Sequence, residues 1–226
     1  MTIRKVVWYS MDENIYIVYD ETTKEGVIID PGAEAGRIID CVEENGVDVK
    51  AILLTHGHGD HIGAVPALKE KYGCPIVCHR CEKDVLEDAA INLSSMICGT
   101  VEFSPDITME DGDVFSFGGI DVKYLYTPGH TPGGACLYIE KEKIVFSGDT
   151  LFFGSIGRTD FPNTGRKKKE PECGCGYPMS ENFNKLIESI QNKLLVLPDD
   201  TLVLPGHGRE TNIGFERNNN PFLGGW

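Results

Sequence analysis

Leu54-Thr55-His56-Gly57-His58-Gly59-Asp60-His61-Ile62 places three imidazoles and one carboxylate within six consecutive positions, directly after the apolar run Ala51-Ile52-Leu53-Leu54. An apolar run bounded by turn residues predicts a buried strand. If that strand ends at Thr55, alternate residues of the following loop point the same way, so His56 and His58 can face one ion. The stretch therefore predicts a metal site.

The second half of the same stretch predicts how the site is completed. We expect Asp60 and His61 to open a helix and to turn toward a second position nearby. We also expect Gly57 and Gly59 to let the loop fold tightly, because glycine adopts backbone angles that a β-carbon forbids. Two neighbouring cation positions follow from this arrangement.

The remaining histidines strengthen this interpretation. The chain has six histidines, and three of them lie outside the stretch: His79, His130 and His207. His130 and His207 each follow a Pro-Gly turn at the end of an apolar strand, and Asp149 closes a further apolar run that begins at Ile144. Four predicted strands therefore end in side chains that can ligate a metal.

Length and composition bound the class of protein. With 226 residues, 41% of them hydrophobic, the chain can bury a core, and we expect one α/β domain over residues 1–226. The formal net charge of −14 disfavours nucleic-acid binding, which needs a basic surface. No run approaches the roughly 20 apolar residues of a membrane span, and Met1–Lys5 lacks the apolar core of a signal peptide. We expect a cytoplasmic protein that binds neither nucleic acid nor membrane; the sequence does not predict its oligomeric state.

The eight cysteines are scattered through a chain that has its own core, so we expect reduced thiols and no disulfide framework. Cys74, Cys78 and Cys81 have the spacing of a radical-enzyme iron–sulfur motif, but that motif begins inside a predicted strand. We favour small buried thiols at these positions and a structural or surface role for His79.

Hydrophobic spacing predicts the order of strands and helices. The predicted strands are 15–19, 26–30, 49–55, 75–78, 113–117, 120–126, 135–139, 143–147 and 201–204. The predicted helices are 33–45, 60–72, 82–90 and 180–195, the last capped by Ser180 and with an inner stripe of Phe183, Leu186, Ile187 and Ile190. Two similar halves of this kind predict two packed sheets with helices outside.

An ordered set of motifs carries a resemblance to a known family. The motifs are Thr-His-x-His-x-Asp-His at 55–61, Pro-Gly-His-Thr-Pro-Gly at 128–133, Ser-Gly-Asp-Thr at 147–150 and Pro-Gly-His-Gly at 205–208. In this order they resemble the metallo-β-lactamase superfamily. The run 149–152 followed by Gly157-Arg158-Thr159-Asp160-Phe161-Pro162 is similar to the loop of short glyoxalase II-like hydrolases. The resemblance covers nearly the whole chain.

The resemblance implies a four-layer αββα sandwich of two pseudo-symmetric halves, with metals at one edge between the sheets. It implies two divalent ions with Asp149 bridging them. The ligands implied are His56, His58 and His130 for one ion, and Asp60, His61 and His207 for the other. Nitrogen and carboxylate ligands suit zinc, which we favour, and also iron or manganese.

The reaction implied is hydrolysis of a thioester of the hydroxyacylglutathione type. Two ions about 3.5–4 Å apart share one water and lower its pKa from about 15.7 toward about 7, which gives a bridging hydroxide at neutral pH. We expect Asp60 to be the catalytic residue that orients this nucleophile. The leaving thiolate has an intrinsic pKa of about 8.5 and needs little protonation.

Substrate recognition is the least specified part of the resemblance. Arg158 can receive a carboxylate of a small-molecule thiol cofactor, whereas we expect the run 166–169 to be solvated. Few residues follow His207, so we expect the C-terminal helical domain of longer glyoxalase II enzymes to be absent. The loop Lys167 to Tyr177, which contains Cys173 and Cys175, is expected to be an exposed insertion near the mouth of the active site.

Three alternatives to a thioesterase stay open. A persulfide dioxygenase resembles the same family and uses one iron held by the equivalents of His56, His130 and Asp149. A metal-dependent nuclease is disfavoured by the net charge of −14. A non-catalytic, metal-stabilised binding module would enclose its ions fully in protein ligands, whereas a catalytic site keeps one position open.

Overall fold

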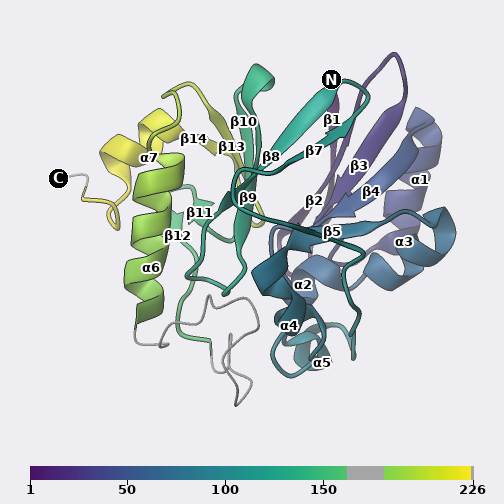
Figure 1. Cartoon of the computed structure of the whole chain (residues 1–226), viewed down its shortest axis with the longest axis horizontal. Helices are drawn as coiled ribbons and strands as arrows, with labels where there is room; N and C mark the ends of the chain where they lie inside the picture. Colours follow the sequence, from purple (N-terminus) through teal and green to yellow (C-terminus); the bar gives the residue numbers. More distant parts are fainter. Residues whose placement is uncertain (162–180, 225–226) are drawn as a thin grey trace.

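The computed structural model describes residues 1–161 and 181–224. Two six-stranded sheets pack face to face, and helices cover both outer faces (Figure 1). Helices α1 (Ala35–Asn45) and α3 (Val65–Tyr72) cover the first sheet, and α6 (Asn182–Ser189) and α7 (Ile213–Asn219) lie outside the second. These four layers confirm the predicted αββα sandwich.

The strands are arranged in two large sheets and one small one. The first sheet has the order β1 (Thr2–Trp8), β2 (Glu13–Tyr19), β3 (Glu25–Ile29), β4 (Asp48–Leu53), β5 (Ile76–His79) and β6 (Ile107–Met109). The second has the order β14 (Thr211–Asn212), β13 (Leu202–Pro205), β10 (Ile144–Gly148), β9 (Ala135–Ile139), β8 (Ile120–Tyr126) and β7 (Val114–Phe117). The small sheet pairs β11 (Leu151–Phe152) with β12 (Ser155–Ile156).

The shorter helical segments lie mainly between the strands. They are α2 (Gly59–Ile62), α4 (Lys83–Leu86), α5 (Ser94–Ile97), the 3-10 helices η1 (Arg80–Glu82) and η2 (Glu140–Glu142), and the π-helical segment η4 (Ile190–Leu194).

Strand direction brings the site-bearing loops to one edge of each sheet. Because β3 and β4 are parallel, Asp30 and His56 follow them at the same edge. In the second sheet β10 is parallel to β13, and β8 runs in the same direction because both β8 and β10 are antiparallel to β9. His130, Asp149 and His207 therefore also emerge at one edge.

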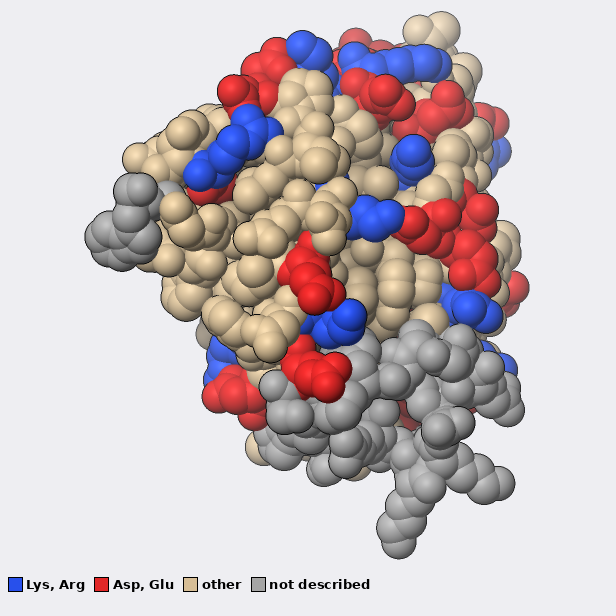
Figure 2. All heavy atoms as spheres, turned by 60° about the vertical axis from the view of Figure 1, so that its left-hand side comes forward, with Lys and Arg blue, Asp and Glu red and all other residues tan. Residues whose placement is uncertain are grey.

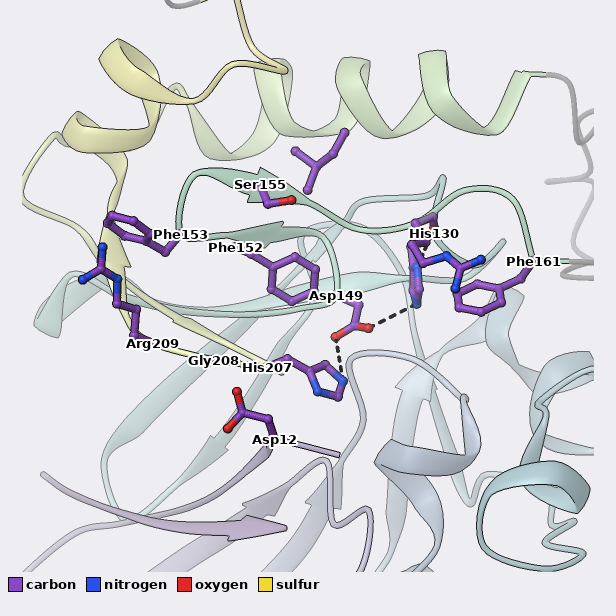
Figure 3. Close-up of a pocket in the computed structure, with 12 residues that line it drawn as sticks. Asp12, His130, Asp149, Phe152, Phe153, Ser155, Phe161, His207, Gly208 and Arg209 are labelled. Carbon is purple, nitrogen blue, oxygen red and sulfur yellow. Dashed lines mark hydrogen bonds and ion pairs between the residues drawn. The ribbon is translucent and has the colours of Figure 1, made fainter. Parts of the chain in front are cut away.

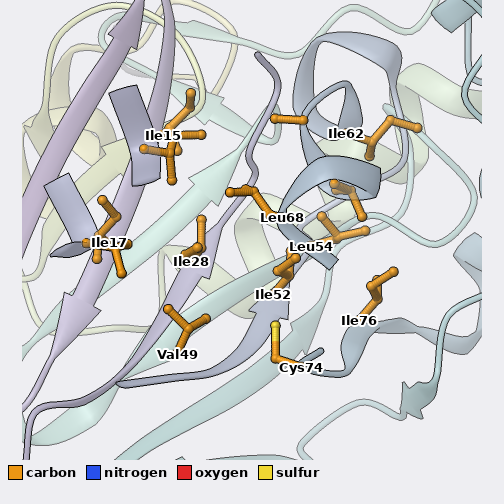
Figure 4. Close-up of a cluster of buried hydrophobic side chains, with 14 of the residues drawn as sticks. Ile15, Ile17, Ile28, Val49, Ile52, Leu54, Ile62, Leu68, Cys74 and Ile76 are labelled. Carbon is orange, nitrogen blue, oxygen red and sulfur yellow. The ribbon is translucent and has the colours of Figure 1, made fainter. Parts of the chain in front are cut away.

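Three apolar clusters fill the three interfaces between the four layers. Strand β2 shows how, since its side chains alternate between faces. Ile15 and Ile17 pack with α1 and α3 in the first cluster (Figure 4), whereas Tyr16 and Val18 face the second sheet in the middle cluster. A third cluster packs the second sheet against α6 through Leu186. Burying each large aliphatic side chain contributes about 1.5–3 kcal/mol, and burial on both faces explains why these strands read as continuous apolar runs.

The sequence predicts the inner strands better than the edges. The predicted hairpin over 15–19 and 26–30 is confirmed by the antiparallel pairing of β2 with β3. Strands β1 and β6 and helix α7 were not predicted. In β1, Arg4 and Lys5 are both exposed, so the strand lacks a two-residue alternation, and its order comes from pairing along its whole length with β2.

The helix predicted over 60–72 is wrong in its continuity. Helix α2 ends at Ile62 and α3 begins at Val65, with Pro66 in the first turn of α3. Proline fits only the first turn of a helix because it has no N–H to donate. The helix predicted over 82–90 is likewise too long, since α4 ends at Leu86.

The predicted inner stripe of the last long helix is wrong at one position. Leu186 and Ile190 are fully buried, but Phe183 remains 47% exposed. Helix α6 also passes into the π-helical segment η4, which shifts the helical period after Ser189. The predicted cap Ser180 lies outside the described residues, as do the run 166–169, Cys173 and Cys175.

The reason predicted for Gly57 and Gly59 is also wrong. Neither is among the described residues with a positive φ. Both are required by lack of space instead: a β-carbon on Gly59 would lie 2.5 Å from Ser94 Cα, and one on Gly57 would lie 2.9 Å from Leu86 Cδ2. The loop over residues 55–61, called the metal loop below, is tight because α4 and α5 pack directly against it.

The surface carries mixed charge. On the face shown in Figure 2, Lys and Arg side chains lie beside Asp and Glu, and the described residues there form no broad basic patch. No helix in the described part of the chain is long and apolar enough to cross a membrane.

Replacing Gly59 by alanine tests the packing of the metal loop. We expect Gly59→Ala to lower the free energy of unfolding by about 1–3 kcal/mol, because the new methyl group meets the backbone of Ser94. Gly36→Ala in α1 is the control, since a β-carbon there meets no atom within 4 Å; it should leave stability unchanged or slightly raised. Urea unfolding measures both, and equal stabilities would contradict the packing explanation.

Candidate metal centre

The predicted ligands arrive from four strand ends. His56 and His58 lie in the loop after β4, and Asp60 and His61 lie in α2. The others come from the second sheet: His130 follows β8, Asp149 follows β10 and His207 follows β13. The seven side chains meet where the edges of the two sheets face each other.

One group combines His56, His58 and His130. Its three candidate ligand atoms lie within 4.8 Å of one another, and all three residues are buried. His58 Nδ1 is 2.9 Å from His130 Nε2. The ring of His56 lies 4.9 Å from that of His58 and 4.8 Å from that of His130, measured between centroids.

A second group combines Asp60, His61 and His207, whose candidate ligand atoms also lie within 4.8 Å of one another. His61 Nε2 is 3.2 Å from His207 Nε2, and His207 Nε2 is 3.3 Å from Asp60 Oδ2. These are the two sets that the sequence assigned to two ions.

Asp149 lies between the two groups. Its Oδ2 is 3.5 Å from His130 Nε2, and its Oδ1 is 3.3 Å from His61 Nε2 and 3.6 Å from His207 Nε2. Figure 3 shows the carboxylate with one contact toward His130 and another toward His207. Asp149 therefore occupies the position expected of a bridging ligand.

The outward nitrogen of two imidazoles is held by a backbone carbonyl. His130 Nδ1 is 2.7 Å from the carbonyl oxygen of Arg158, and His207 Nδ1 is 3.0 Å from that of Met11. His61 Nδ1 is 3.2 Å from Asp30 Oδ2. Since carbonyl oxygens only accept, the outward nitrogens of His130 and His207 carry a proton, and in the neutral imidazole this leaves a lone pair on the inward Nε2.

These lone pairs make the cluster fit a metal. His61 Nε2 and His207 Nε2 face each other at 3.2 Å, close enough to share one ion. His56 Nε2 and Asp149 Oδ1 are buried with no hydrogen-bond partner in the described residues. A cation between the two groups would give these atoms a partner. The donors are nitrogen and carboxylate oxygen, which zinc, iron and manganese all accept.

Protonation favours the ligating forms of Asp149 and of the group His56, His58 and His130. Burial holds the pKa of His56 well below its ordinary value and lowers that of His58 to about 3. Burial also lowers the pKa of His130. Although burial raises the pKa of the Asp149 carboxyl, the neighbouring His61 outweighs it and holds that pKa well below its ordinary value. Neutral imidazoles and an ionised carboxylate are the species that bind metals.

Comparison with known proteins identifies the family. A family model described as the metallo-beta-lactamase superfamily matches residues 11–207. The chain belongs to the metallo-beta-lactamase superfamily.

Relatives of this superfamily member include named hydrolases. The probable metallo-hydrolase YqgX of Bacillus subtilis is 40% identical over 88% of this chain and 88% of its own length. Hydroxyacylglutathione hydrolase GloC of Haemophilus influenzae is 36% identical over 99% of this chain and 98% of its own.

Solved structures of the superfamily match almost the whole chain. BLEG-1 B3 metallo-beta-lactamase has a TM-score of 0.85 and 36% identity, covering 99% of this chain and 100% of that one. The di-iron-bound form of TTHA1623 has a TM-score of 0.78 and 35% identity, covering 97% and 100%. ETHE1 of Myxococcus xanthus has a TM-score of 0.76 and 27% identity, covering 99% and 85%.

Asp30 is a site residue that the sequence interpretation missed. It follows β3 and is buried, and its carboxylate accepts hydrogen bonds from Thr55 N at 2.8 Å and Thr55 Oγ1 at 2.6 Å while it also contacts His61. It therefore orients His61 and fixes the start of the metal loop. A signal was present, because Asp30 ends an apolar strand as Asp149 does.

Glu82 is a second missed residue, and it joins the two metal-bearing loops. Its Oε1 accepts from Gly57 N at 2.8 Å, between the first two histidines. Its Oε2 accepts from Thr131 Oγ1 at 3.0 Å and Gly133 N at 2.8 Å, just after His130. No local pattern marks Glu82, since its partners lie far away in the sequence.

Arg158 lies at the pocket but its charge is already paired. Its Nε and Nη2 donate to the two oxygens of Asp160 at 2.9 and 3.2 Å, and its guanidinium lies 4.4 Å from the ring centroid of Phe161. What the sequence could not predict is that its backbone carbonyl orients His130. Its substrate-binding role stays a prediction.

Cys74, Cys78 and Cys81 are all buried, and none belongs to a ligand group among the described residues. Burial raises the pKa of each thiol. His79 is also buried, with its ring stacked 4.1 Å from that of Tyr126. These contacts favour the structural interpretation of all four residues over an iron–sulfur site.

A cavity of about 540 Å³ opens beside the metal centre. Its floor includes His130, Asp149 and His207, and aromatic side chains form much of its wall (Figure 3). The aromatic side chains are Phe152, Phe153 and Phe161. The ligand cluster is therefore accessible on one side to a small molecule with apolar parts.

Replacing Glu82 by glutamine tests its position between the loops. Burial raises the Glu82 pKa from 4.5 to about 7, so the folded protein holds this proton more tightly than the unfolded chain does. Its contribution to stability is full below pH 4.5 and is lost as pH rises through 7, by about 3 kcal/mol in total. The excess stability of the native chain over Glu82→Gln should fall by most of that amount from pH 5 to pH 8 in urea titrations at equal metal content. A difference independent of pH would contradict this assignment.

Proposed function

We propose that this protein is a binuclear metallohydrolase that cleaves thioesters of the hydroxyacylglutathione type. The observation that carries the proposal is the pair of three-residue groups on either side of Asp149, each compact enough for one ion. The full-length similarity to hydroxyacylglutathione hydrolase GloC supports the substrate class. Zinc is the metal that we favour, and iron and manganese suit the same donors.

In this proposal the ligands divide between the two ions as the two compact groups indicate. His56, His58 and His130 would hold one ion, and Asp60, His61 and His207 would hold the other; Asp149, which contacts His61 and His130, would serve both. When bound, two such ions supply an acidified water, and hence a hydroxide nucleophile, at neutral pH.

Asp60 is suited to orient that nucleophile. Although burial raises its pKa, the contact with His207 outweighs this effect and lowers the pKa, so the carboxylate is ionised at neutral pH. An ionised carboxylate accepts a hydrogen bond from the attacking water and holds its lone pair toward the substrate carbonyl. The leaving thiolate has a pKa of about 8.5 and departs without a strong general acid.

The persulfide dioxygenase alternative needs only one of the two groups. One iron on His56, His130 and Asp149 would leave Asp60, His61 and His207 without a ligand role. The close approach of His61 to His207 therefore favours two ions. A purely structural metal is disfavoured because the cavity opens on the ligands, whereas structural sites are closed. The predicted cytoplasmic location rests on the sequence alone and stays a prediction.

Turnover of S-D-lactoylglutathione tests the thioesterase proposal. We expect Asp60→Ala to reduce kcat/KM by about 10²–10⁴-fold, because the nucleophile loses its orienting carboxylate. Asp200→Ala is the control, since Asp200 is an exposed acid paired with Lys143; it should stay within about twofold of the native chain. If the native chain and Asp60→Ala both hydrolyse the thioester at the background rate while metals remain bound, the proposal is wrong.

Metal stoichiometry and oxygen uptake separate the two enzyme candidates. We expect two ions per chain in protein purified without added salts, and no oxygen consumption with glutathione persulfide. One iron per chain with sulfite formation would instead establish the dioxygenase. Elemental analysis and an oxygen electrode give the two readouts on the same sample.

A further inference from the structure

One wall of the cavity carries a stack of three planar groups. The Arg209 guanidinium lies 3.3 Å from the ring centroid of Phe153. Phe153 also stacks on Phe215 of α7, with centroids 4.8 Å apart and planes inclined by 18°. A guanidinium stacked face-on keeps its N–H donors at the edge, where they can meet an oxyanion in a bidentate manner.

Buried contacts hold this stack in place. Gly154, the residue after Phe153 in the turn between β11 and β12, donates its N–H to both carboxylate oxygens of Glu216 at 3.0 and 3.1 Å. Glu216 is fully buried in α7 and also accepts from Thr211 Oγ1 at 2.6 Å and Asn220 Nδ2 at 2.7 Å. The turn and the helix that present the two rings are thus tied together by one carboxylate.

Across the cavity lies a second arginine stacked on a phenylalanine, but that arginine is paired with an acid. In Figure 3, Arg209 and Phe153 lie at one end and Phe161 at the other, with Phe152 and Asp149 between them. The guanidinium over Phe161 belongs to Arg158 and is paired with Asp160. Among the described residues Arg209 forms no ion pair. In a chain of net charge −14, it is, among the lining residues that the structure describes, the cation left available for an anion.

We propose that Arg209 is a specificity-determining residue that binds the anionic end of the thiol carrier, a carboxylate or a phosphate, while the acyl group lies at the metal centre. The inference rests on the proposed thioesterase function and adds the residue that recognises the thiol carrier. Because Arg209 lies two residues after His207, the anion site and the centre are fixed to the same loop. Preorganisation on the ring lowers the entropy cost of binding the anion.

Two pairs of lactoyl thioesters isolate the anion. Esters of N-acetylcysteamine and N-acetylcysteine differ by a carboxylate, and esters of pantetheine and 4′-phosphopantetheine differ by a phosphate. The native metal-loaded chain should prefer one anionic member over its neutral partner by about tenfold or more in kcat/KM, the usual gain from a charge-assisted hydrogen bond. Which pair shows the preference distinguishes a carboxylate carrier from a phosphate carrier.

Variants assign the preference to Arg209. Arg209→Gln should abolish it by raising KM for the anionic ester alone, with kcat and the neutral ester unchanged. Arg209→Lys, which keeps the charge but loses the planar fork, should retain part of it. Arg37→Gln is the matched control, because Arg37 also lies over an aromatic ring, that of Tyr9, but on α1; it should retain the full preference.

A loss of activity toward neutral and anionic esters alike in Arg209→Gln would overturn the inference, as would equal preference in the native chain and the variant.

Binding of the corresponding S-octyl thioethers, followed by calorimetry, gives a readout without turnover. Tighter binding of the anionic thioether that disappears in Arg209→Gln supports the anion site even if no ester is hydrolysed. In that case the thioesterase proposal fails and the anion site stands. Equal binding of both thioethers to the native chain would overturn the anion site.

Discussion

The site depends on imidazole nitrogens that the protein forces to face one another. Backbone carbonyls fix the outward nitrogens of His130 and His207. His61 Nε2 and His207 Nε2 lie only 3.2 Å apart, so two like groups are crowded together unless a cation binds both. The fold therefore holds these groups in a crowded arrangement that metal binding relieves, which couples metal affinity to the integrity of the whole sandwich.

The sandwich can hold this arrangement because its two sheets deliver the ligands as rigid bodies. Each sheet is packed on both faces by apolar clusters, so buried strand residues such as Leu53 of β4 and Phe146 of β10 have little freedom to move. The two half-sites then meet through buried acids. Asp30 fixes the loop of the first sheet, and Glu82 ties that loop to the one bearing His130. Phe152 on β11 and Phe153 after it line the open cavity, and Phe215 of α7 stacks on Phe153.

Whether the sequence predicts a feature depends on how far apart along the chain the interacting residues lie. The ligand spacing in 55–61 and the strand-end positions of His130, Asp149 and His207 are local, and the structure brings all of them together. The partners of Glu82 lie 25, 49 and 51 residues away, so no window along the chain could indicate its role. Edge strand β1 was missed for the same reason, since its order comes from β2 and not from its own pattern.

The sequence by itself determined the ligand types, their order and the alternation of strands and helices, because spacing of two and 3.6 residues is set by backbone geometry alone. Only the tertiary structure decided which arginine charges at the cavity stay unpaired and why the metal loop needs glycine. Asp160 neutralises Arg158, whereas the ring of Phe153 holds Arg209 with its charge unpaired. Gly59 proved necessary for the space taken by Ser94 and not for its backbone angles. These outcomes depend on contacts between distant segments, which exist only once the two sheets have packed.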